Sequence, residues 1–291
     1  MGKYTKNKCI LCEKNPPIRE SHVIPKFIFN KLKECNPLGV LIDAKHEHLM
    51  QDGWKGAYLC RECEEQFSRY EKWFCERIFN PFWNNNLSNV NYKEELKLFI
   101  ASIFFRYFSH FCIVEDKSCP VLTTILDDLR LNLIANTPEK ITSAFYFMPL
   151  PKVEKNGEFP PGINTYFFSA IDGNLFPFCY CIPNVIKELL VFLYVKLPGN
   201  LLVCSYPNEY PLFNKNLISN SGVISLRPID ISFFKLFNDN FIKEANCIWK
   251  NYVPTISKKW DDWIGRIKKK GGTQINSHAV DAYNNDINLS Q

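Results

Sequence analysis

The sequence predicts an α+β protein in which a small cysteine-rich N-terminal domain precedes a larger mixed domain. Two Cys-x-x-Cys pairs stand within the first 63 residues, and apolar residues after the second pair recur at helical spacing. Several β-rich runs then follow one another between residues 145 and 206. With 291 residues, of which 46% are hydrophobic, the chain is long enough to build a packed core over two domains.

The two cysteine pairs are Cys9/Cys12 and Cys60/Cys63. Each two-residue loop can bring its pair of sulfur atoms to one metal ion, so the four cysteines predict a tetrahedral structural zinc site. Two unrelated pairs of free thiols are the weaker alternative. The other eight cysteines follow no ligand spacing and are interpreted as small buried hydrophobic residues.

Within the N-terminal part, Pro25 ends an extended stretch and residues 26–35 are expected to form a short helix. Residues 43–56 are polar, contain Asp52-Gly53 and predict a turn-rich loop. A longer amphipathic helix is expected over residues 63–79, because its apolar residues form one stripe: Phe67, Tyr70, Phe74 and Ile78.

In the second part, helices are expected over residues 93–108, 123–134 and 232–249. Pro198-Gly199-Asn200 predicts a hairpin turn between two strands. The β-rich runs that predict strands are Phe145–Met148, Thr165–Ala170, Phe176–Ile182, Leu189–Leu197 and Leu201–Tyr206.

These patterns divide the chain into a metal-bound domain over residues 1–86 and an α+β domain over 87–270. Residues 271–291 are rich in Gly, Asn, Ser and Asp and predict a disordered tail. The second domain shows no metal-ligand spacing. We expect it to contact a protein partner, to mediate assembly of a homo-oligomer or to recruit nucleic acid.

The composition favours a soluble protein of the cytoplasm. The start of the chain shows no secretory signal, and no uninterrupted apolar run approaches the twenty residues that span a bilayer. The formal charge of +5 is compatible with nucleic acid without indicating it. Basic residues and two tryptophans cluster over residues 258–270, either as a phosphate- and base-binding patch or as a solvated last helix.

The segment Ser21-His22-Val23-Ile24-Pro25 lies between the cysteine pairs, and Leu59-Cys60 begins the second pair at the expected start of a helix. This arrangement resembles an HNH endonuclease domain of the ββα-metal, treble-clef-type class over residues 5–80. The resemblance implies that the four cysteines hold zinc and that His22 ends the first strand of a hairpin. It also implies that His22 activates the water that attacks a phosphodiester, while one divalent ion stabilises the developing charge. Nucleases joined to an unrelated domain often serve in bacterial defence against foreign DNA, antiviral defence included.

His22 suits this role on chemical grounds, because a hydrolase needs a base that titrates near neutral pH and a cation beside the attacked phosphate. A histidine that only forms hydrogen bonds inside the zinc module is the alternative.

Several positions depart from the family pattern. Ser21 and Lys55 stand where the family has metal ligands or an asparagine, and Glu64 replaces a histidine. A glutamate binds hard cations, so Glu64 would help to hold Mg²⁺ or Mn²⁺, with Asp52 or Ser21 as a further ligand.

Other residues near these motifs have weaker claims. Glu64 and Glu71 fall on the same shoulder of the predicted helix and are expected to converge on His22, or to be solvated. His46 and His48 either bind metal or lie in an exposed loop. The candidate phosphate contacts are Arg19, Lys26, Lys55, Arg61 and Arg69.

The sequence thus predicts a metal-dependent endonuclease that favours DNA over RNA. Two alternatives remain open: a non-catalytic zinc-stabilised module that binds nucleic acid or protein, and a toxin-like effector whose nuclease is restrained by the second domain.

Overall fold

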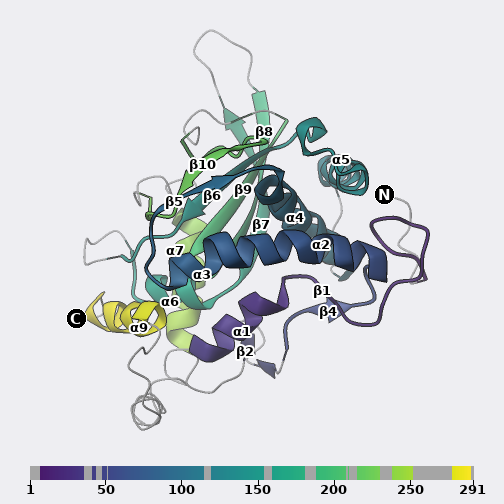
Figure 1. Cartoon of the computed structure of the whole chain (residues 1–291). Helices are drawn as coiled ribbons and strands as arrows, with labels where there is room; N and C mark the ends of the chain where they lie inside the picture. Colours follow the sequence, from purple (N-terminus) through teal and green to yellow (C-terminus); the bar gives the residue numbers. More distant parts are fainter. Residues whose placement is uncertain are drawn as a thin grey trace.

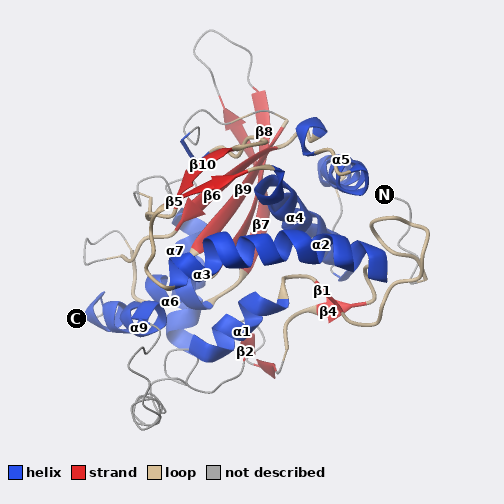
Figure 2. Cartoon of the chain, viewed as in Figure 1, coloured by secondary structure: helices blue, strands red, loops and turns tan. Residues whose placement is uncertain are grey.

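The computed structural model describes residues 7–35, 41–43, 48–50, 52–114, 119–153, 159–180, 188–207, 209, 215–229, 238–251 and 277–289. Helices and strands alternate along these residues, and the predicted α+β class is confirmed (Figure 2). Strand β1 (Ser21–His22) pairs antiparallel with β4 (Lys55–Gly56), and the two lie beside helix α2 (Figure 1).

The chain between β1 and β4 forms helix α1 (Lys26–Cys35) and a second antiparallel pair, β2 (Leu41–Asp43) with β3 (His48–Met50). Helix α1 was predicted at these bounds. The loop predicted over residues 43–56 instead contains β3 and β4. Strands of two or three residues are too short to show an alternating pattern in the sequence, which is why the analysis missed them.

The second cysteine pair starts α2 (Arg61–Phe74), whose buried residues include Phe67, Tyr70 and Phe74, as the apolar stripe predicted. Cys60 has an extended backbone at φ −78° and ψ 170°, so the helix begins directly after it. A π-helical turn, η1 (Cys75–Phe79), and the short α3 (Asn80–Trp83) continue the same direction. The helix predicted over residues 63–79 is therefore confirmed, with a local widening at its end.

Helix α4 (Glu94–Val114) is buried around most of its circumference and packs against α2, α5 (Pro120–Ala135) and strand β8 (Glu188–Leu197). A helix that is apolar on all sides belongs inside a core or inside a membrane. By length and composition α4 passes the test for a membrane span, but 61% of its apolar window is buried within the fold. This burial is consistent with the core helix of a soluble protein.

The main sheet has the strand order β6-β9-β8-β7, antiparallel throughout. Its strands are β6 (Ala144–Pro149), β7 (Asp172–Tyr180), β8 (Glu188–Leu197) and β9 (Asn200–Tyr206). The predicted turn joins β8 to β9, and Gly199 adopts φ +75°, which favours glycine. Outside this sheet lie a 3₁₀ turn, η2 (Pro138–Lys140), and the pair β5 (Asn89–Tyr92) with β10 (Gly222–Ser225).

One predicted strand is wrong. Residues 165–170 fall largely in helix α6 (Ile163–Ser169). Their Thr, Tyr and Phe side chains favour strands locally, but both ends of α6 are held by distant residues. Asp286 accepts hydrogen bonds from the backbone N–H groups of Asn164 and Thr165, and Lys196 donates to two carbonyls at the other end.

The prediction of a disordered tail is also wrong for residues 277–289, which form helix α9 (Ser277–Leu289) packed against α6. Helix α7 (Asn238–Asn251) matches most of the helix expected over 232–249, whose first residues lie outside those described. The basic, tryptophan-containing cluster at 258–270 also lies outside them.

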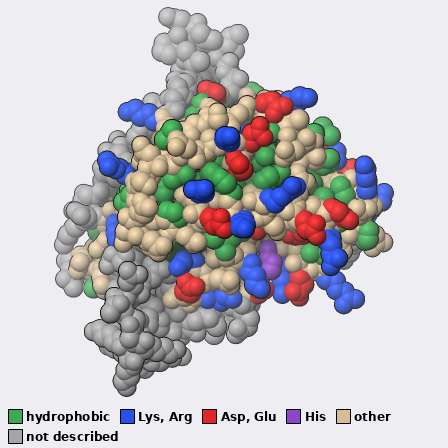
Figure 3. Space-filling model, in the orientation of Figure 1, with side chains coloured by type: hydrophobic (Ala, Val, Ile, Leu, Met, Phe, Trp, Pro, Cys, Tyr) green, Lys and Arg blue, Asp and Glu red, His purple; other side chains and the backbone are tan. Residues whose placement is uncertain are grey.

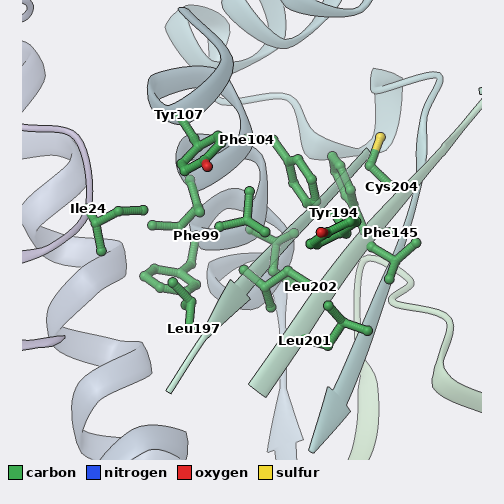
Figure 4. Packing of buried hydrophobic residues seen from close by; sticks show 14 of the residues in the cluster. Ile24, Phe99, Phe104, Tyr107, Phe145, Tyr194, Leu197, Leu201, Leu202 and Cys204 are labelled. Atoms are coloured by element: carbon green, nitrogen blue, oxygen red, sulfur yellow. The ribbon is translucent and has the colours of Figure 1, made fainter. Parts of the chain in front are cut away.

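The N-terminal part and the sheet share one continuous core. Figure 4 shows Ile24, which follows β1, pointing into the same apolar interior as Phe99 of α4 and Leu197 of β8. Farther along α4, the ring of Phe104 stacks on Phe145 of β6 at 5.7 Å between centroids. Helix α4 thus lies between the N-terminal module and the sheet. A domain boundary near residue 86 remains a prediction.

Candidate metal centre and histidine site

The four predicted cysteines lie together. The Sγ atoms of Cys9, Cys12, Cys60 and Cys63 are all within 4.8 Å of one another. The Cys12 and Cys60 sulfurs are 3.8 Å apart. Four thiolates at Zn–S distances of about 2.3 Å in a tetrahedron place their sulfurs about 3.8 Å from each other. The cluster could therefore hold a metal such as zinc.

Backbone hydrogen bonds bring the two cysteine pairs together. The Ile10 N–H donates to the Tyr58 carbonyl and the Ile18 N–H to the Leu59 carbonyl, each at 2.8 Å. Hydrogen bonding between the Cys9 and Cys63 side chains lowers the pKa of Cys9 and raises the pKa of Cys63, and burial raises the pKa of Cys60. Without a metal ion, Cys9 is therefore the cysteine that most favours the thiolate, which is the form that binds metal.

His22 lies on β1, opposite Lys55 of β4, and its side chain is 18% exposed. The next residue extends the pairing, because the Val23 N–H donates to the Trp54 carbonyl at 2.9 Å. His22 thus lies at the end of a strand, as the resemblance to HNH domains implied. The imidazole is therefore fixed at the rim of the module while part of it reaches solvent.

Asp52 is the acidic partner of His22. The Nε2 atom of His22 lies 3.4 Å from Asp52 Oδ1, and the Gly53 N–H donates to the same oxygen at 2.9 Å. The Lys55 ammonium lies 3.3 Å from the other oxygen. Burial opposes ionisation of Asp52, but the Gly53 amide, His22 and Lys55 together hold the pKa of its carboxyl below its usual value. Both Asp52 oxygens thus already have partners.

Lys55 also forms a salt bridge with Glu20 at 3.1 Å, which together with Asp52 raises the pKa of its ammonium group. Lys55 therefore neutralises two carboxylates, Asp52 and Glu20, near His22.

Glu64 lies in the first turn of α2, directly after Cys63, and faces β1. Burial raises the pKa of its carboxyl, while Ser21, Arg106 and His22 act in the opposite direction and Glu71 adds to the rise. Ser21 Oγ and Glu64 Oε1 are buried atoms, and the Ser21 hydroxyl lies close enough to lower the pKa of Glu64, but neither oxygen forms a hydrogen bond of normal length with a described residue. These two oxygens are the ones available to a water molecule or a hard cation. A carboxylate and a hydroxyl suit Mg²⁺ or Mn²⁺, so this pair fits the expected ion.

Arg106 of α4 is a further residue of this site, and it was not among the residues predicted from the sequence. Its guanidinium is buried, with its side chain 2% exposed, and Nη1 lies 2.8 Å from Glu71 Oε1. The same nitrogen donates to the carbonyl of His22 at 3.2 Å. The signal in the sequence is one arginine in the run Phe104-Phe105-Arg106-Tyr107-Phe108, where an isolated charge would be costly to bury. Glu71 therefore binds Arg106, whereas the sequence predicted that it would either converge on His22 or be solvated.

The remaining candidates are less informative. Arg19, Lys26, Arg61 and Arg69 are exposed. Figure 3 shows acidic and basic side chains interspersed on this face, with no uniformly basic groove. A cavity of about 670 Å³ lies along another side of α2, lined by residues that include Arg69 and Tyr70, and not by His22 or Glu64. The side chains of His46 and His48 lie outside the described part of the chain.

Comparison of the chain with family models, with curated proteins and with solved structures gives no match. We therefore infer function from the geometry of five residues, called the histidine site: Ser21, His22, Asp52, Glu64 and Arg106.

Proposed function

We propose that the protein is a metal-dependent endonuclease of the HNH type that hydrolyses phosphodiester bonds, in DNA in preference to RNA. One observation carries the proposal: a partly exposed histidine, paired with a carboxylate, lies near a carboxylate oxygen and a hydroxyl that are both buried and form no hydrogen bond of normal length with the described residues. The four-cysteine cluster supports it, because zinc there would anchor the chain on both sides of His22.

His22 acts as the general base. With its proton on Nε2, directed at Asp52, the imidazole has the Nδ1 lone pair free to take a proton from water. The water oxygen attacks phosphorus as its proton passes to His22, and the bond to the leaving oxygen breaks. The leaving oxygen keeps the bonding electron pair and takes a proton from solvent. Asp52 fixes the tautomer and stabilises the imidazolium that forms, which is a different role from the metal ligand expected from the sequence.

Glu64, with Ser21 beside it, would hold a divalent ion. When bound there, Mg²⁺ or Mn²⁺ would supply positive charge to stabilise the negative charge that develops during hydrolysis. Arg106, like Ser21, lowers the pKa of Glu64 against the larger effect of burial, and so favours the ionised form that binds a cation.

A non-catalytic binding module is the second candidate. The observation that favours it is the Lys55 ammonium, which lies between Asp52 and Glu20 at the place where a cation would otherwise be attracted. In that case zinc shapes a surface for nucleic acid or protein, and His22 forms only structural contacts.

Nicking of supercoiled plasmid separates the two candidates. We expect wild-type protein with added Mg²⁺ or Mn²⁺ to nick DNA, and His22→Ala to lower the rate by about 10²- to 10⁴-fold because the general base is lost. Zinc content and thermal unfolding should match the wild type. Equal inactivity of both proteins, each folded and zinc-loaded, would instead support the binding module.

A further inference from the structure

The two strands that carry the histidine site are very short. β1 and β4 pair over two residues each, with one further backbone bond from Val23 to Trp54. So few ladder hydrogen bonds leave the direction of the His22 peptide weakly determined by the ribbon itself. Its orientation must come from contacts outside the ribbon.

Helix α4 supplies those contacts on the β1 side. Arg106 donates to the carbonyl of His22, 84 residues earlier in the chain, and binds the Glu71 carboxylate on α2. Its guanidinium also lies 5.2 Å from the centre of the Phe67 ring. One planar group therefore joins the strand that bears His22 to the helix that bears Glu64.

The same helix contacts the β4 side. The ring of Trp54, which lies between Gly53 and Lys55, stacks on His110 with centroids 6.1 Å apart and also contacts Tyr107. His110 Nδ1 lies 2.6 Å from the Tyr58 hydroxyl. Helix α4 thus contacts both strands through residues 106, 107 and 110. These contacts fix the segment that contains His22 and the segment that contains Asp52.

We propose that Arg106 is a positioning residue of the endonuclease reaction, through which α4 sets the orientation of His22 relative to Glu64. This inference rests on the proposed function. A fully buried guanidinium needs a compensating partner, and Glu71 provides it. Lysine would not reproduce the contact, because one ammonium group lacks the flat fork of donors with which Arg106 joins two partners.

Arg106→Lys tests the proposal, with Arg130→Lys as the matched control. Arg130 of α5 also joins a core helix to the N-terminal module, because its guanidinium lies 3.3 Å from Glu13. This contact lies next to the cysteine cluster and not at the histidine site. We expect Arg106→Lys to lower kcat for plasmid nicking by about 10- to 100-fold, as a displaced catalytic group does, with KM within about threefold. Arg130→Lys should retain both values, and both variants should bind zinc.

A kcat for Arg106→Lys within twofold of the wild type, in a protein whose wild type nicks DNA and whose His22→Ala variant does not, would overturn this inference alone. A wild type that never nicks DNA would overturn the proposed function instead. If Arg106→Lys fails to fold, Glu71→Gln replaces it as the test. That variant keeps the shape of the partner and removes its charge, and it should give the same loss of kcat with unchanged KM.

Discussion

Two groups of buried polar residues in this protein differ in how completely they are paired. In the histidine site, Ser21 Oγ, Glu64 Oε1 and Arg106 Nη2 have no partner among the described residues. Around α6 the Thr165 hydroxyl also lacks a partner among them, but the charged side chains are paired. Asp286 accepts from two backbone N–H groups, and Lys196 donates to the carbonyls of Tyr166 and Ala170. Asp172 accepts from the hydroxyls of Tyr166 and Tyr194, each at 2.9 Å.

The contrast separates stabilising polar groups from reactive ones. The charges around α6 complement the helix dipole, with an acid at the N-terminal end and a lysine at the C-terminal end. Their hydrogen-bonding capacity serves a buried helix, and we assign them no chemistry. The histidine site contains buried polar atoms without hydrogen bonds to described residues. Such atoms lower the stability of the fold unless a ligand or a water molecule binds them. This difference is why the function is placed at His22 and not at Lys196.

The largest effect is expected at the cysteine cluster. Cys60→Ser removes one of four ligands, and zinc binding contributes on the order of 10 kcal/mol to the folding of such modules. We expect less than one zinc per chain and loss of structure around β1 and β4, measured by metal analysis and hydrogen exchange. Cys204→Ser, which changes a buried cysteine of the sheet, serves as the control and should keep its zinc. A folded Cys60→Ser protein would count against the metal centre.

A smaller effect is expected at Lys196, one of the buried charged residues around α6. Its burial should make the stability of the protein depend on pH. Burial lowers the pKa of Lys196 from 10.5 to about 7. Between these values the unfolded chain holds a proton that the folded chain lacks, so a rise in pH favours folding, by up to about 1.4 kcal/mol per pH unit. We expect the free energy of unfolding of the wild type, relative to that of Lys196→Met, to increase between pH 7.5 and pH 9. Parallel pH curves for the two proteins would show that Lys196 is not desolvated as described.

The sequence anticipated the features that depend on local spacing. The cysteine pairs, the stripe of α2 and the hairpin turn at Gly199 each depend on residues a few positions apart. The sequence did not reveal features made by distant partners. Helix α6 is held by Asp286, 122 residues beyond Asn164, and Arg106 meets His22 across 84 residues. No local sequence pattern predicts such pairings. For Arg106, the sequence shows only that a charged residue interrupts an apolar run.

The most direct test of the central claim compares the variants Glu64→Gln and Glu65→Gln. The rate of plasmid nicking by each zinc-loaded protein is measured as a function of Mn²⁺ concentration. The two substitutions are chemically identical and lie one residue apart on α2, but Glu65 is exposed. We predict that Glu65→Gln nicks DNA as the wild type does, while Glu64→Gln needs at least about tenfold more Mn²⁺ or loses activity, because it lacks the carboxylate ligand. Identical Mn²⁺ curves for the two variants would contradict an ion held at Glu64 and, with it, the hydrolytic centre proposed for this protein.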